Sequence, residues 1–67
     1  MSSRPRTIIE IVGRDPDDWP VLTPQEGQLV EQQLDAADDG DLIDGVDVEG
    51  RRFSIPKRDV ERVSHRE

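Results

Sequence analysis

The sequence predicts an α+β fold in which one capped α-helix packs on a small antiparallel sheet. Three observations support this prediction: a β-branched apolar run near the start, a helix-capping signal at Thr23, and alternating apolar residues on both sides of Glu49-Gly50. The predicted order is strand, helix, strand, strand, strand, with a short helix as the alternative for the last element. We expect a disordered lead at 1–6, a single domain at 7–64 and a tail at 65–67.

The composition restricts the classes of protein to which this chain belongs. A chain of 67 residues forms one domain with a thin core, and without cysteine it has neither disulfides nor a cysteine zinc site. Small domains without such cross-links often depend on a partner subunit, so we expect self-association. The net charge of −7 argues against direct nucleic-acid or membrane binding. We expect a cytoplasmic protein, because no apolar run is long enough for a membrane span or a secretory signal.

The acidic, arginine-rich and cysteine-free composition resembles that of small proteins from actinobacteria and their phages. This resemblance implies an origin and carries no function with it.

The first predicted strand is the β-branched run Thr7 to Val12. Ile9 and Ile11 share one face, and Ile8 shares the other with Val12, so we expect the strand to be buried on both faces or to meet a partner. Two prolines and three aspartates then predict a loop over residues 13–20. Trp19 lies in this loop and is either a lid on the core or an anchor for a partner.

The helix begins with the clearest local signal in the chain. Thr23 is a predicted N-cap, Pro24 suits the first helical position, and Glu26 completes a capping box. The helix is expected to run through residues 25–38, and Gly27 permits a close approach to the sheet. Its predicted apolar stripe consists of Leu29, Val30, Leu34 and Ala37.

An acid-rich stretch follows the helix. Residues 35–50 contain seven acids and no base, and Asp38 and Asp39 lie at the helix end that disfavours anions. An EF-hand calcium loop starting at Asp35 would need ligands where the sequence has Ala37 and Val46. We therefore expect a solvated acidic turn, with no metal and no cofactor.

Residues 42–55 predict a β-hairpin with a two-residue turn at Glu49-Gly50. Strict register would place Asp44 on the core face opposite Ile55. A bulge at Asp44-Gly45 would avoid this and bring Ile43 opposite Ile55. The predicted core face consists of Ile43, Val46, Val48, Phe53 and Ile55. On the outer face, Asp47 is expected to pair with Arg52.

The chain after Pro56 has two interpretations. A strand over residues 60–64 would pair back onto the hairpin, whereas a short helix over residues 56–65 would place Val60 and Val63 on one face. His65 is expected to be a solvated tail residue. No nucleophile motif, phosphate-binding loop or metal-ligand spacing is present, so we do not expect an enzyme.

Three functions remain open. The first is a protein-binding regulatory module that acts by stoichiometric binding or homo-oligomerisation. The second is an acidic nucleic-acid mimic that blocks a DNA- or RNA-binding protein. The third is a small sheet domain that binds nucleic acid through its C-terminal arginines. The candidate partner-binding residues are Trp19, Asp38, Asp39, Asp41 and Asp44.

Overall fold

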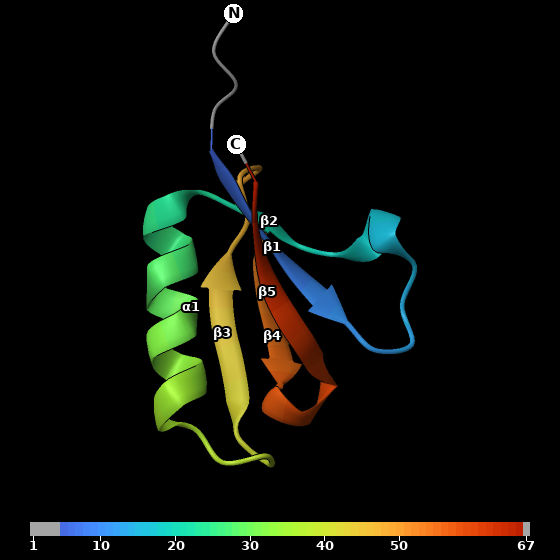
Figure 1. The fold of residues 1–67 in the computed structure, drawn as a ribbon, viewed down its shortest axis with the longest axis vertical. Helices are drawn as coiled ribbons and strands as arrows, with labels where there is room; N and C mark the ends of the chain where they lie inside the picture. The colour runs from blue at the N-terminus through green and yellow to red at the C-terminus, as the bar shows by residue number, and fades with distance from the viewer. Residues whose placement is uncertain (1–4, 67) are drawn as a thin grey trace, which may run out of the picture.

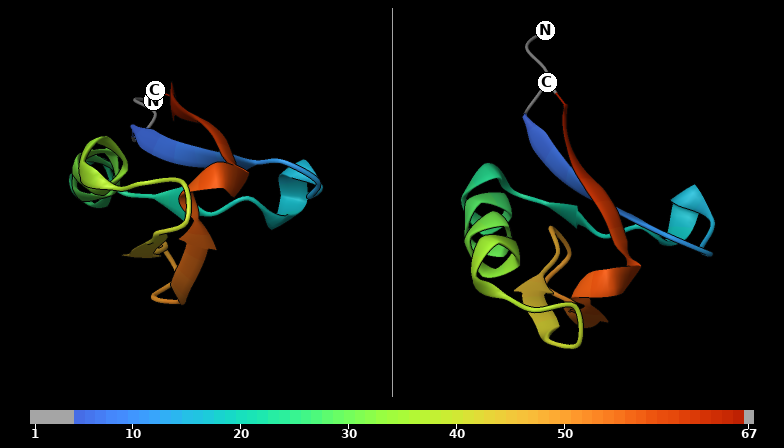
Figure 2. Two further views of the ribbon diagram at one scale, coloured as in Figure 1. Left: turned by 90° about the horizontal axis from the view of Figure 1, so that it is seen from below. Right: turned by 60° about the horizontal axis from the view of Figure 1, so that its bottom comes forward.

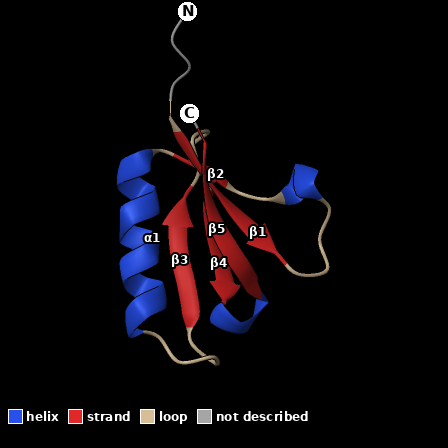
Figure 3. Ribbon diagram, viewed as in Figure 1, coloured by secondary structure: helices blue, strands red, loops and turns tan. Residues whose placement is uncertain are grey.

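Within residues 5–66, one α-helix and five short strands make up the fold, which confirms the predicted α+β class (Figures 1 and 3). The computed structural model describes residues 5–66. In chain order the elements are strand β1 (Arg6–Ile11), 3-10 turn η1 (Pro16–Asp18), strand β2 (Val21–Leu22), helix α1 (Pro24–Ala36), strand β3 (Leu42–Val46), strand β4 (Arg52–Pro56), 3-10 turn η2 (Lys57–Asp59) and strand β5 (Val60–Arg66). The two-residue strand β2 is an addition to the predicted order.

The ends of the chain differ from the predicted domain limits. Positions 1–4 of the expected disordered lead lie outside the described residues, and Arg6 already belongs to β1. At the other end β5 extends through Arg66, so His65 lies in a strand. No helix within residues 5–66 is long and apolar enough to cross a membrane.

The strands form two antiparallel sheets, β2-β1-β5 and β3-β4 (Figure 2). The last segment is a strand, as one of the two interpretations proposed, but its predicted partner is wrong: β5 pairs with β1 and not with the hairpin. Pro56 and η2 redirect the chain away from β4, and Val12 N donates to Asp59 O at 2.8 Å where β5 begins. This route places Val63 opposite Ile9.

The hairpin has the predicted core pair but a different turn. Ile43 lies opposite Ile55 as expected, yet the β3-β4 register is regular from Leu42 to Val46, so the predicted bulge is wrong. The register comes from a longer turn. Asp47 N donates to Arg51 O, and Asp47 Oδ1 accepts from Glu49 N and Arg51 N, each at 2.9 Å. Asp47 therefore holds the turn and is not the outer-face partner of Arg52.

Gly45 leaves space for the ring of Phe53 and does not form a bulge. A Cβ atom on Gly45 would clash with Cζ of Phe53, because the aromatic ring rests on the glycine across the hairpin. The register irregularity instead falls between β1 and β5, where Glu61 is the extra residue.

Helix α1 starts as predicted and ends slightly earlier. Thr23 Oγ1 accepts from Glu26 N at 3.3 Å, and the helix stops at Ala36. The predicted close approach is confirmed, since a Cβ atom on Gly27 would lie 2.5 Å from Thr7 Oγ1.

A single small core lies between α1 and the two sheets. Its fully buried apolar residues are Ile9, Ile11, Leu22, Val30, Ile43 and Ile55. Two expected core residues are exposed: Leu29 to 51% and Val48 to 46%. Val48 lies in the longer turn, and Val46 lies opposite Arg52 on the outer face, so neither side chain joins the core face as predicted.

Candidate functional site

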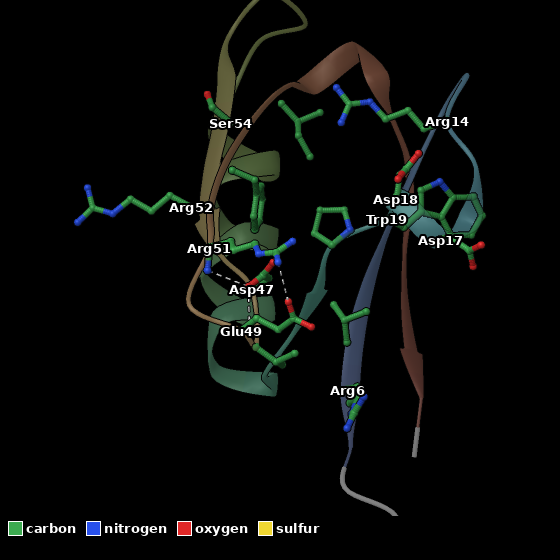
Figure 4. Close-up of a pocket in the computed structure, with 15 residues that line it drawn as sticks. Arg6, Arg14, Asp17, Asp18, Trp19, Asp47, Glu49, Arg51, Arg52 and Ser54 are labelled. Carbon is green, nitrogen blue, oxygen red and sulfur yellow. Dashed lines mark hydrogen bonds and ion pairs between the residues drawn. The ribbon is translucent and has the colours of Figure 1, made fainter.

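A groove of about 600 Å³ lies between the hairpin and the segment that leads into β2 (Figure 4). One wall is formed by residues 47–49 and 51–55, and the other by residues 14 and 17–21 together with Arg6. Its apolar lining consists of Trp19, Pro20, Val21, Val48, Phe53 and Ile55. The groove thus offers apolar surface beside a strand, in a molecule that is otherwise highly charged.

The two walls are joined at the hairpin turn. Val48 N donates to Val21 O at 2.8 Å, which ties the turn to β2. Pro20 O accepts from Ile9 N at 3.1 Å, so the opposite wall is fixed to β1. Both walls are therefore held by backbone hydrogen bonds.

Trp19 contributes to the groove and to the core at once. Its Nε1 donates to Ile11 O at 3.2 Å, and its half-buried ring packs against the core residues. This position agrees with the lid interpretation, and the anchor interpretation stays a prediction. The ring covers the edge of the core, and its remaining surface lines the groove.

The outer edge of β4 runs along the groove. Hydrogen-bonded pairs alternate with non-bonded pairs in an antiparallel ladder. The bonds Asp47 N to Arg51 O and Lys57 N to Asp41 O mark the bonded pairs of the hairpin. By this alternation the backbone N–H and C=O groups of Arg52 and Ser54 point away from β3, and within residues 5–66 no strand pairs with them.

The opposite edge of the hairpin is covered. Gln33 Nε2 donates to Asp44 O at 2.7 Å, and Gln33 Oε1 accepts from Asp44 N at 3.0 Å. The amide side chain thus occupies the place of a neighbouring strand on β3. Of the two hairpin edges, only that of β4 is left for another strand.

Charges of both signs surround the groove. Four arginines and four acids line it: Arg6, Arg14, Arg51, Arg52, Asp17, Asp18, Asp47 and Glu49. Asp47 is engaged in the turn, and Glu49 lies 3.6 Å from Arg51. Figure 4 shows Arg14 reaching over one end of the groove and Arg52 extending away from it.

The structure does not bring the predicted partner-binding residues into one site. Trp19 lines the groove, whereas Asp38, Asp39, Asp41 and Asp44 do not. Asp44 lies exposed on β3, on the same face of the hairpin as Ser54. The other three acids lie in the turn after α1.

Backbone carbonyl groups of that turn hold it against η2. Asp41 Oδ2 accepts from Asp38 N at 3.0 Å, and Asp39 O accepts from Arg58 N at 3.3 Å. Lys57 Nζ donates to Ala37 O at 2.6 Å and so places a cation at the negative end of the helix dipole. Of the three acids in this turn, only Asp41 makes these contacts through its carboxylate, and Asp38 and Asp39 use backbone atoms. Within residues 5–66 no group of three or more His, Cys, Asp or Glu is arranged to hold a metal ion.

His65 makes contacts that sequence reasoning missed. Its Nδ1 lies 3.3 Å from Thr7 Oγ1, and its Nε2 lies 2.6 Å from Glu31 Oε1. A hydroxyl, an imidazole and a carboxylate also form hydrolytic triads. Here Thr7 is only 1% exposed and lies against Gly27, which leaves no room for a substrate at its hydroxyl. The three side chains tie β1, β5 and α1 together.

Of the C-terminal arginines, Arg51 and Arg52 line the groove with Phe53, whereas Arg62 does not. Arg62 Nε donates to Glu10 Oε2 at 2.8 Å on the outer face of the β1-β5 pair. The Phe53 ring packs on Gly45 and the core and so is not an open stacking platform.

Comparison of the chain with protein-family models, curated proteins and solved structures finds no match. The functional assignment therefore depends on the geometry of the groove and of the β4 edge.

Proposed function

We propose that this chain is a small non-enzymatic protein-binding module that takes up an extended protein segment along β4. The observation that supports this proposal is the open edge of β4 beside an apolar groove. A segment added to a sheet edge gains main-chain hydrogen bonds, and adjacent pockets select its side chains. Trp19 and Phe53 supply the apolar contacts, and stoichiometric binding of this kind needs no catalytic group.

The acidic nucleic-acid mimic has weaker support. The carboxylate of Asp41 accepts from Asp38 N inside the turn, which accounts for the acid at position 41 without an external partner. Direct nucleic-acid binding through the C-terminal arginines is also less well supported, because Arg62 is engaged by Glu10 and Phe53 packs inward.

Peptides selected from a random displayed library test the proposed module. We expect selected peptides to shift the amide NMR signals of Arg52 and Ser54 and to protect these amides from hydrogen exchange. Ser54→Pro removes one outward-facing N–H and should weaken binding about tenfold or more. Ser54→Ala keeps that N–H and should bind like the wild type.

Selected peptides that shift the amides of Asp38, Asp39 and Asp41 and leave β4 unchanged would refute the proposal. Thermal unfolding of both Ser54 variants controls for loss of the fold.

A further inference from the structure

The outward-facing backbone groups of β4 are complementary to themselves. Arg52 and Ser54 each present one N–H and one C=O, and Pro56 ends the edge because it has no N–H. If a second β4 lies antiparallel with the two-fold axis at Phe53, Arg52 of each copy faces Ser54 of the other. All four groups of each copy are then hydrogen-bonded.

We infer that the extended segment bound along β4 is β4 of a second copy of this chain. This inference depends on the function proposed above and names the partner. The product is a symmetric dimer with one continuous sheet, β3-β4-β4-β3. Because the same surface is used on both copies, the assembly closes at two.

Charges on the outer face of the hairpin favour this arrangement. Asp44 lies opposite Ser54 across the hairpin, and Arg52 of the second copy would lie on the other side of Ser54. Two strand spacings separate the Cα atoms of Asp44 and that arginine by about 10 Å. Extended arginine and aspartate side chains span this distance over the small serine. Symmetry gives two such ion pairs.

Asp44 and Arg52 are available for these contacts. Both are exposed, and within residues 5–66 neither makes an ion pair. Figure 4 shows Arg52 extending away from its own groove. The antiparallel arrangement also brings the hairpin turn of the second copy, which carries Glu49, towards η2 of the first copy. The exposed Arg58 lies in η2.

Apolar contact at the two-fold axis adds to the charge pattern. Phe53 is half-buried on the groove side of β4, and directly opposed residues of an antiparallel pair share one face. The two Phe53 rings would therefore be neighbours. Burial of this surface compensates for a small core, which has six fully buried apolar residues in the described part of the chain.

Sedimentation equilibrium of the full chain across micromolar to millimolar concentrations is the first test. We expect a monomer–dimer equilibrium for the wild type and for Ser54→Ala, and a dissociation constant raised about tenfold or more by Ser54→Pro. A dimer that Ser54→Pro leaves unchanged would use another surface and would overturn the inference.

Charge reversal provides a second test that keeps the backbone intact. Arg52→Glu and Asp44→Arg should each weaken the dimer, because each places like charges together across the interface. The double variant restores opposite charges and should recover most of the lost affinity. Two single variants with no effect on dimerisation would contradict the proposed register.

Cysteine trapping tests the position of the two-fold axis. The natural chain lacks cysteine, so Phe53→Cys carries a single thiol. At a non-hydrogen-bonded pair the Cα atoms are about 4.5 Å apart, which permits a disulfide. Oxidation with diamide should give a covalent dimer for Phe53→Cys and little for the control Gln32→Cys on α1. Equal yields would count against the axis.

The experiments distinguish failure of the proposed dimer from failure of the proposed protein-binding function. If the wild type is monomeric throughout and library peptides still bind along β4, the second copy is the wrong occupant and the protein-binding function stands. If neither a second copy nor peptides occupy β4, both proposals fail.

Discussion

Glu10 is the most informative titratable residue of the fold. Only 7% of it is exposed, although it lies on the outer face of the β1-β5 pair. The hydroxyl of Ser64 donates to its carboxylate, and Arg62 Nε lies 2.8 Å from Oε2. The Ser64 hydrogen bond and then the Arg62 guanidinium hold the pKa of Glu10 below its usual range, although partial burial opposes them.

A stability difference that depends on pH follows from this lowered pKa. A carboxyl whose folded pKa is depressed stabilises the protein above its unfolded pKa, and this contribution is lost as the pH falls through the folded pKa. Glu10→Gln should therefore lower the free energy of unfolding near neutral pH and make progressively less difference below about pH 4.5. Urea unfolding of both proteins from acid to neutral pH measures this. The exposed control Glu61→Gln should show no such trend, and a constant difference for Glu10→Gln would contradict the assignment.

The role of a single residue could be predicted from the sequence where its main contact is with a residue nearby in the chain or where the residue type itself indicates the role. The Thr23 cap depends on Glu26 three residues away, and Gly27 could be linked to close packing because it lacks a side chain. Gln33, Lys57 and His65 were missed because their partners lie 11, 20 and 34 or more residues away. Long polar side chains carry no sequence signal that identifies such distant partners.

At the scale of elements, the hairpin turn sets the register. The alternating pattern correctly predicted both strands and the Ile43–Ile55 pair. It could not reveal that Asp47 closes a longer turn, because a two-residue turn at Glu49-Gly50 satisfies the same local signals. Gly50 has a φ of +84°, a conformation that favours glycine, so the observed turn explains this glycine as well as the predicted two-residue turn does.

Replacement of Asp47 tests its role in the turn. Asp47→Ala removes the acceptor for two backbone N–H groups and should lower the free energy of unfolding by about 1–2 kcal/mol. Asp47→Asn keeps a side-chain oxygen and should cost less than half of this. Urea denaturation of the two variants gives the comparison. Equal losses would indicate that the negative charge matters more than the hydrogen bonds.

At the scale of the whole molecule, the arrangement of strands depends on contacts far apart in the chain. The strand identity of residues 60–64 was one of two predicted alternatives, yet its pairing with β1 joins residues separated by 49 or more positions. The same holds for the groove. Trp19 and Asp44 were candidates from the sequence, but only the folded chain places the wall with Trp19 beside the β4 edge.

Gln33 determines how many edges the β3-β4 hairpin offers to another strand. Its side chain satisfies the N–H and C=O of Asp44, so the hairpin exposes one edge at β4 and none at the middle of β3. An assembly through β4 alone stops at two copies. A molecule with two open edges could continue into longer stacks, because each added copy presents a new edge.

Gln33→Ala should therefore change both stability and assembly. Loss of two hydrogen bonds should lower the free energy of unfolding by about 1 kcal/mol. The uncovered β3 edge should also produce species larger than the wild-type assembly, which light scattering coupled to size-exclusion chromatography would detect. The neighbouring Gln32 is exposed, so Gln32→Ala is the matched control and should behave like the wild type. If Gln33→Ala is destabilised but elutes unchanged, α1 itself covers the β3 edge by its bulk, and the amide contributes only the two hydrogen bonds.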